Sequence, residues 1–237
     1  MPLPVYLDPA RVRGQPKDKG DSVAVEIKFG DRVKEGVEIC KANLVPTILM
    51  PLIAGLAGML VVAPAIVVQM VVDPTIGAIL QIPLSFASMA VQGIFVINWM
   101  AAIKAAKHEG KKIEIGDLLN FENAVGKGLT YMLAGLGFVF CCIPGIMLLF
   151  AAPIMADKPG TGVGDVLKAA FAFGKGNIVP LLILFIVMIV LIIIGEIACG
   201  VGVLFTAPLA QATVFLAYDT HKASVEAAAA EAGVTLS

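Results

Sequence analysis

Four long apolar blocks constrain the fold of this chain more than any other feature. They cover residues 44–72, 76–103, 129–156 and 178–218, and Glu196 is the only charged residue inside them. A membrane-spanning helix needs about 20 apolar residues, so the first two blocks predict one spanning helix each. As a single helix the last block would be roughly 60 Å long, about twice the thickness of a bilayer core, so it must fold back on itself.

The composition agrees with a polytopic, all-α membrane protein. Hydrophobic residues make up 59% of the chain and charged residues only 15%, whereas soluble domains average about 25% charged residues. Residues 1–28 are polar and rich in proline, without the basic run and compact apolar region of a cleavable signal peptide. We expect a polar N-terminal tail there; the alternative is a small docked β element formed by the alternating Val23, Val25, Ile27 and Phe29.

A sequence phrase occurs twice and predicts an internal repeat. Residues 29–50 (FGDRVKEGVEICKANLVPTILM) align without a gap with residues 163–184 (VGDVLKAAFAFGKGNIVPLLIL). A fainter copy at 115–134 keeps Gly116, Asp117 and Lys127. Each copy is a charged amphipathic stretch that continues into an apolar one. We therefore expect a membrane domain over 29–222, with parallel repeats at about 29–106, 114–158 and 162–222, followed by a C-terminal tail at 223–237.

Each repeat is expected to be an interfacial helix followed by a transmembrane hairpin, which gives about six spans. The alternative for the amphipathic helix is a cytoplasmic helix packed on a neighbour. The aspartates that follow glycine, Asp31, Asp117 and Asp165, suit the positive end of a helix. Asn43 and Asn177 resemble N-caps with proline in the next turn. The middle copy lacks this break, which predicts either one continuous helix over 117–141 or a hairpin that enters the membrane only part way.

The basic residues predict the orientation in the membrane. All 17 Lys and Arg lie within residues 1–41, 104–127, 158–175 and at Lys222. If every apolar unit is a hairpin, these regions share one side, which the positive-inside rule identifies as the cytoplasm. The turns near 73–75, 142–145 and 195–202 then lie outside. The expected location is a bacterial inner membrane, with multiple passes and both termini cytoplasmic; a single crossing by 129–156 would give five helices instead.

The order of these motifs resembles one bacterial group of proteins. An amphipathic helix, a span that reaches Ile143-Pro144-Gly145, a second span and the phrase GDVLKAAFAFGKGN follow one another in residues 29–220. This order is similar to the membrane domain of glycerophosphoryl diester phosphodiesterases and related multi-span proteins. The soluble catalytic barrel of those enzymes is absent from this sequence, so the resemblance implies an integral membrane module and no catalytic residues.

The apolar blocks contain few candidate functional groups. His108 and His221 have no partner at metal-ligand spacing, and no metal or nucleophile motif occurs, so we expect no catalytic residue, metal or cofactor. A polar stripe at helical spacing runs through the second block: Gln81, Ser85, Ser88 and Gln92. Such a stripe predicts hydrogen bonds between helices, with Gln69 and Gln211 as candidate partners. The alternative is a polar path or a headgroup slot.

Three of the four cysteines lie at predicted outer turns. Cys141, Cys142 and Cys199 would face an oxidising space, whereas Cys40 lies on the predicted inner side. The sequence suggests a disulfide between Cys199 and either Cys141 or Cys142. The alternative is that these cysteines are small packing residues.

Two functions from different classes follow from these patterns. The first is a non-enzymatic membrane module that binds a protein partner, or a second copy of itself, and organises an assembly. The second is a transporter or lipid-handling component, which the repeats, the proline-broken helices and the polar stripe favour. Membrane lipids are expected partners in both cases, and nucleic acid is not. An intramembrane enzyme lacks candidate residues.

Overall fold

The computed structural model describes residues 27–140, 142–198 and 200–237, and every regular element in them is an α-helix. The all-α class is therefore confirmed. The possible β element upstream of Ile27 lies outside the described residues, and Phe29 begins the first helix. The helices are α1 (Phe29–Ala42), α2 (Leu44–Val71), α3 (Pro74–Glu109), α4 (Ile115–Leu118), α5 (Ala124–Phe140), α6 (Cys142–Met147), α7 (Ala151–Asp157), α8 (Val163–Gly176), α9 (Ile178–Ile197), α10 (Val203–Thr220) and α11 (Lys222–Glu231).

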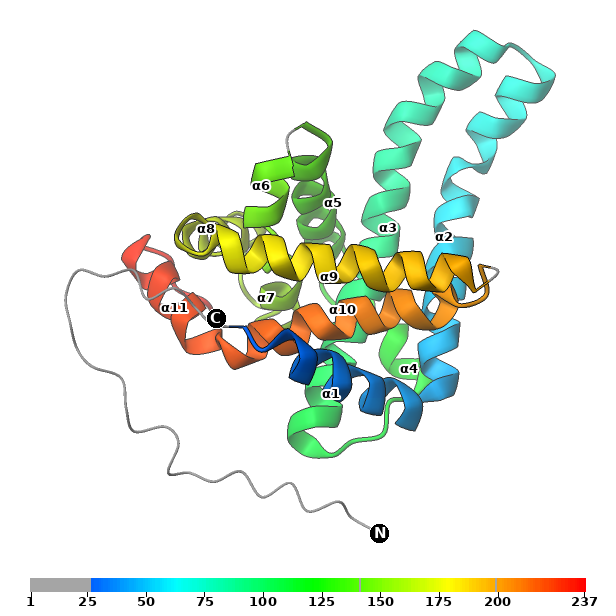
Figure 1. Ribbon diagram of the computed structural model, residues 1–237. Coiled ribbons are helices and arrows are strands. Elements are labelled where there is room, and N and C mark those ends of the chain that lie inside the picture. The colour runs from blue at the N-terminus through cyan, green and yellow to red at the C-terminus, as the bar shows by residue number, and fades with distance from the viewer. Residues whose placement is uncertain (1–26, 141, 199) are drawn as a thin grey trace, which may run out of the picture.

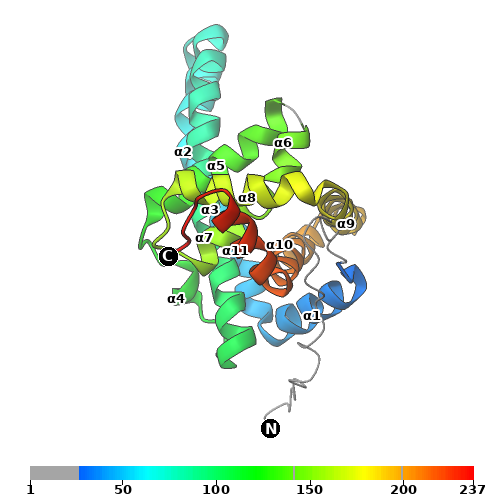
Figure 2. The ribbon, with the colours of Figure 1, turned by 90° about the vertical axis from the view of Figure 1, so that its left-hand side faces the viewer.

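Two helical hairpins dominate the architecture. The outer part of the α2–α3 hairpin projects beyond the rest of the molecule, whereas the α9–α10 hairpin runs crosswise against its base (Figures 1 and 2). The inner half of α3 enters the core, where Trp99 is fully buried and its indole N–H donates to the carbonyl of Pro208 in α10 at 3.0 Å. Phe150, Phe173 and Tyr218 pack in the same core through ring contacts. The core therefore joins the hairpins at their bases and leaves the tip of α2–α3 free.

In the described part of the chain, three helices are long and apolar enough to cross a membrane: α2, α3 and α9, with 28, 36 and 20 residues. These helices are consistent with an integral membrane protein. The other predicted spans are shorter. α5 has 17 residues, and its return leg is divided into α6 and α7 by a turn at residues 148–150. The second half of α10, from Pro208 to Tyr218, is largely buried in the core.

The first and third copies of the repeat form the same local structure. α1 and α8 each have 14 residues, each ends just before an asparagine, and α2 or α9 begins just after it. The predicted helix breaks at Asn43 and Asn177 are therefore present, but the predicted capping is wrong. Neither asparagine side chain caps the following helix. Each amide instead donates to a carbonyl four residues earlier, Ile39 at 2.9 Å or Phe173 at 3.1 Å. The Ile39 carbonyl also accepts the backbone N–H of Asn43 at 3.1 Å, so the Asn43 side chain adds a second bond to that oxygen at the end of α1.

The middle copy departs from this pattern, and the prediction of one continuous helix over residues 117–141 is wrong. α4 has only four residues, and the chain is irregular from Leu119 to Asn123, where Asn123 adopts a left-handed conformation with φ of 51°. Asparagine tolerates that conformation better than most residues. The side chain of Asn120 also accepts the N–H of Glu122 at 2.8 Å, which competes with helical hydrogen bonding.

The amphipathic helices α1 and α8 pack on neighbouring helices. Gly36 of α1 lies against Leu209 and Thr213 of α10, so closely that a Cβ atom there would touch Leu209 at 3.0 Å. The apolar face of α8 buries Val166, Ala170 and Phe173. The segment predicted as a C-terminal tail contains α11, which docks on α8 through the buried Val225 and Ala229. Downstream of it, the backbone N–H of Ser237 donates to the Thr161 hydroxyl at 2.9 Å.

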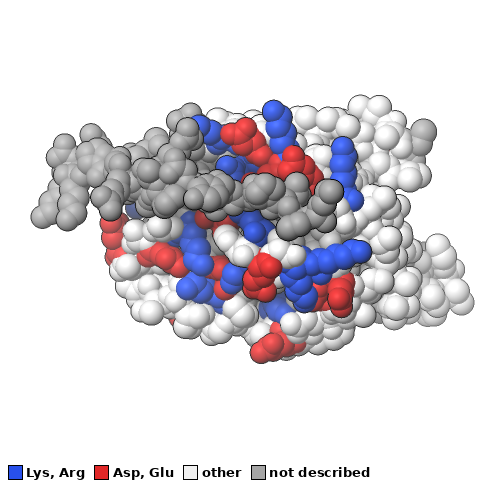
Figure 3. Space-filling view, turned by 90° about the horizontal axis from the view of Figure 1, so that it is seen from below, with Lys and Arg blue, Asp and Glu red and all other residues white. Residues whose placement is uncertain are grey.

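Among the described residues, ion pairs link parts of the four basic regions to one another. Lys107 of α3 contacts Glu35 of α1 and Asp219 of α10, each at 3.0 Å. Lys104 and Lys222 both contact Asp157, at 2.8 and 2.7 Å, and Lys158 contacts Glu226 at 3.5 Å. Viewed from below, basic and acidic side chains gather together on one face of the molecule (Figure 3). The charged surface thus lies opposite the projecting end of α2–α3.

Candidate functional site

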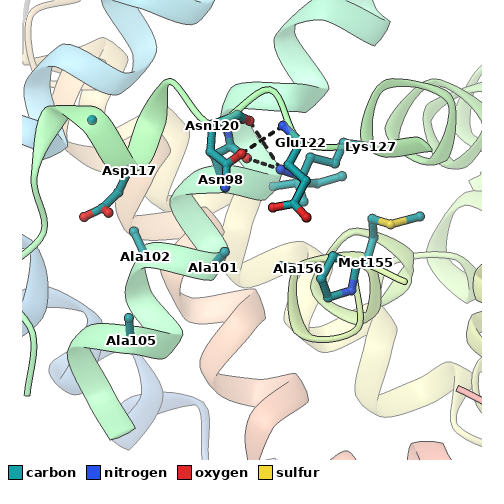
Figure 4. Close-up of a pocket in the computed structure, with 13 residues that line it drawn as sticks. Asn98, Ala101, Ala102, Ala105, Asp117, Asn120, Glu122, Lys127, Met155 and Ala156 are labelled. Atoms are coloured by element: carbon teal, nitrogen blue, oxygen red, sulfur yellow. Dashed lines mark hydrogen bonds between the residues drawn. The ribbon is translucent and has the colours of Figure 1, made fainter. Parts of the chain in front are cut away.

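A cavity of about 470 Å³ lies between α3, the α4–α5 segment and α7. Its polar lining converges from several parts of the chain (Figure 4). Asn98 comes from α3, Asp117 from α4, Asn120 and Glu122 from the irregular segment that follows, and Lys127 from α5. The apolar wall is formed by short or flexible side chains: Ala101, Ala102, Ala105, Met155 and Ala156. A concave space with a few converging polar groups is the usual form of a small-ligand site.

Asn98 holds the irregular segment in place. Its amide nitrogen donates to the carbonyls of Leu118 at 2.9 Å and Asn120 at 2.8 Å. Asn98 is only 2% exposed, and its bonds satisfy carbonyls that the early end of α4 leaves without helical partners. One buried side chain therefore fixes the rim of the cavity.

Lys127 is the most unusual group at this site. It is only 5% exposed, although lysine is almost never buried without a charged partner. Its Nζ atom donates to Asn98 Oδ1 at 2.7 Å and to the carbonyl of Asn120 at 3.3 Å. Burial lowers the pKa of the Lys127 ammonium, and the negative charge of Glu122 opposes this shift. No carboxylate in the described part of the chain forms an ion pair with Lys127.

The two acidic residues of the cavity have different environments. Asp117 accepts from Lys111 Nζ at 2.8 Å and from the backbone N–H of Glu114 at 2.9 Å. Burial tends to raise the pKa of Asp117, but these bonds together with the charge of Lys111 lower it. Glu122 is exposed, and its carboxylate makes no ion pair with a described residue. The cavity therefore contains one carboxylate that is neutralised internally and one that is available.

Comparison of the repeats shows how local structure changes the environment of one lysine. Lys41, Lys127 and Lys175 occupy equivalent positions in the three copies. Lys41 and Lys175 are exposed near the ends of α1 and α8, but the chain break before α5 places Lys127 inside the molecule. Lys127 was predictable from the sequence only as part of the repeat, and neither Lys127 nor Asn98 was expected to be a site residue. An asparagine deep in an apolar block was the available signal.

Asp157 forms a second polar cluster that joins four helices. Besides its contacts with Lys104 and Lys222, its carboxylate accepts the Tyr218 hydroxyl at 3.1 Å. Burial tends to raise the pKa of Asp157, but the hydrogen bonds and charges of Lys104 and Lys222 lower it. The carboxylate has both oxygens occupied by partners from α3, α10 and α11, so this cluster holds the helices together and presents no open ligand position.

The predicted polar stripe divides into two halves. Ser88 is buried and donates to the carbonyl of Gly58 in α2 at 3.0 Å, while Gln92 donates to the Ser88 hydroxyl at 3.1 Å. Gln81 and Ser85 are exposed farther along the projecting hairpin, and they make no hydrogen bond through their side chains to any described residue. The candidate partner Gln69 is exposed as well, whereas Gln211 is half-buried.

Among the described residues, the cysteines and histidines do not line the cavity. Cys40 is buried, which raises the pKa of its thiol to about 12 despite a hydrogen bond with Thr47. Cys142 is exposed at the start of α6, but Cys141 and Cys199 lie outside the described residues, so the disulfide stays a prediction. His108 pairs with Asp219 at 3.0 Å. Within the described ranges, no three His, Cys, Asp or Glu residues are grouped so as to hold a metal ion.

Comparisons with models of protein families, with curated proteins and with solved structures found no match for this chain. The resemblance of residues 29–220 to a phosphodiesterase membrane domain therefore stays a prediction.

Proposed function

We propose that this chain is a non-enzymatic integral membrane protein that binds a partner inside the bilayer through the outer half of the α2–α3 hairpin. The partner is a membrane helix of another protein or of a second copy. One observation carries the proposal: the part of the hairpin that projects beyond the core exposes Gln81 and Ser85 among large apolar side chains.

Hydrocarbon is a poor environment for these polar groups. Met59, Met70 and Ile79 of the same hairpin are at least 64% exposed, as expected for a lipid-facing surface. A glutamine amide cannot hydrogen-bond to lipid tails, but it can bond to a neighbouring helix, and such bonds contribute about 0.6–2 kcal/mol each. Covering Gln81 with a partner helix therefore stabilises an assembly.

We propose that the charged surface lies at the cytoplasmic face of a bacterial inner membrane. Because ion pairs link parts of the four basic regions, we propose that the three hairpins enter the membrane from this side and that both termini are cytoplasmic. The common position of Asp31, Asp117 and Asp165, three residues into their helices, supports three related repeats. The proposed arrangement has about six spans, and it requires α9–α10, which runs crosswise to α2–α3 in this structure (Figure 1), to turn into the membrane alongside that hairpin.

Photocrosslinking in native membranes tests the proposal. A photoreactive residue placed at Gln81 should yield a discrete protein adduct, either with a different protein or with a second copy. Val190 on α9 is the matched control because it is 47% exposed on an apolar helix without a polar stripe. Equal labelling at the two positions, without a discrete protein adduct at Gln81, would show that the hairpin has no specific partner.

A further inference from the structure

We propose that the cavity between α3, the α4–α5 segment and α7 binds a zwitterion, with its phosphate or carboxylate on Lys127 and its ammonium on Glu122. Such a ligand is either the headgroup of an ethanolamine phospholipid or a soluble molecule of the same chemistry. This inference does not depend on the partner of the α2–α3 hairpin.

The cationic side of the site is the buried ammonium of Lys127, which the structure does not fully neutralise. Lys127 has three N–H donors, and the structure gives them two acceptors, Asn98 Oδ1 and the Asn120 carbonyl. Both acceptors are neutral. A buried ammonium without an opposite charge is costly, so an anionic group in the cavity would supply both the missing charge and the third acceptor.

The anionic side is Glu122. Its backbone is fixed by the bond from its N–H to Asn120 Oδ1, while its carboxylate lines the same cavity as Lys127 without forming an ion pair with it. Figure 4 shows both side chains along the same part of the wall. Asp117 is already occupied by Lys111, so Glu122 is the carboxylate available for a ligand ammonium.

The presence of both charges selects among ligand classes. A simple anion would gain from Lys127 but would be opposed by Glu122, whose charge acts on that ammonium. A divalent cation would be opposed by Lys127. A molecule that carries both charges a few bonds apart satisfies both groups, and the volume of about 470 Å³ lies within the range of small-ligand pockets.

The position of the cavity suits a lipid headgroup. Its wall includes Ala101, Ala102 and Ala105 of α3, and the same stretch of α3 carries Lys104 and Lys107, which belong to the charged surface. The cavity is therefore level with the charged end of a candidate spanning helix, the depth at which lipid headgroups lie. The alanine and methionine side chains leave space beside the polar groups for the glycerol end of a lipid.

Native mass spectrometry of the full-length protein tests the lipid form. Protein released from nanodiscs of equal phosphatidylethanolamine and phosphatidylglycerol should retain the ethanolamine lipid with about a tenfold preference, because one charge-assisted contact distinguishes the lipids. Glu122→Gln should abolish this preference, and Lys127→Met should lose both lipids. Glu109→Gln, a change outside the cavity lining, should behave as wild type. Lys127→Met also removes structural bonds, so Glu122→Gln is the decisive variant.

Soluble phosphoethanolamine distinguishes the two sources. If calorimetry detects its binding to wild type but not to Glu122→Gln, a soluble zwitterion suffices; if only the ethanolamine lipid binds, the acyl-bearing headgroup is the ligand. The proposal is overturned if wild type neither binds phosphoethanolamine nor prefers the ethanolamine lipid, or if Glu122→Gln keeps the wild-type behaviour toward the probe that binds.

Discussion

The Asp157 cluster gives the sharpest prediction about stability. The Asp157 side chain is only 3% exposed and accepts from Lys104, Lys222 and Tyr218. In Asp157→Asn the charge is lost while the shape is kept. Hydrogen bonds to charged groups contribute about 1.5–3 kcal/mol each, and removing one member of a buried ion pair costs about 3–5 kcal/mol. Both lysines are about one-third exposed and regain water, so we expect a loss near 3 kcal/mol.

The assay is thermal unfolding of the purified protein in detergent. A loss of about 3 kcal/mol corresponds to a decrease in Tm of about 6–12 °C for a chain of this size. Asp165→Asn is the matched control, because Asp165 is half-exposed and its one ion pair, with Lys168, spans 3.9 Å. Such an exposed pair contributes less than about 1 kcal/mol.

The same cluster predicts a pH dependence of stability. Because the folded-state pKa of Asp157 is lowered, its contribution is present above its unfolded pKa of about 3.9 and is lost as the pH falls through the lower folded value. The difference in Tm between wild type and Asp157→Asn should therefore narrow below about pH 4. If Asp157→Asn has the same Tm as Asp165→Asn at pH 7, this account of the cluster is wrong. It is also wrong if the Tm difference between wild type and Asp157→Asn persists at low pH.

Three further predictions concern packing, reactivity and topology. Gly174→Ala should destabilise the protein by about 1–3 kcal/mol, because its Cβ would collide with the backbone of Met147, whereas Gly164→Ala in the same helix meets nothing within 4 Å and should be neutral or stabilising in thermal unfolding. Cys40 should resist alkylation in the folded protein at pH 8 and react after unfolding, because burial raises the pKa of its thiol to about 12. Mass spectrometry of the unreduced protein shows in the same experiment whether Cys199 pairs with Cys141 or Cys142. Alkylation of all four cysteines after unfolding would exclude the disulfide. Reporter fusions after Asp73, Lys158, Cys199 and the C-terminus should read outside, inside, outside and inside; an external signal at Lys158 would contradict the arrangement of three hairpins.

Local features of the fold were predictable because neighbouring residues produce them. The turn between α2 and α3 lies at Asp73, as expected, where its carboxylate accepts the N–H groups of Thr75 at 2.7 Å and Ile76 at 3.0 Å and Pro74 starts the helix. The breaks at Asn43 and Asn177 were found in the same way. The middle copy was misjudged because its break depends on Asn120 and Asn123, whose effect on the backbone was not recognised.

The all-α class, the apolar helices and most of the helix breaks follow from local patterns, since hydrophobic length and turn-forming residues act over a few positions. The cavity and the Asp157 cluster depend instead on contacts between distant parts of the chain. Lys127 lies 29 residues from Asn98, and Asp157 lies 53 residues from Lys104 and 65 from Lys222. The crosswise packing of α9–α10 against α2–α3 likewise has no local signal (Figure 1). Contacts between such distant residues follow from how buried faces pack together, and no pattern within one segment specifies which distant face its partner will be.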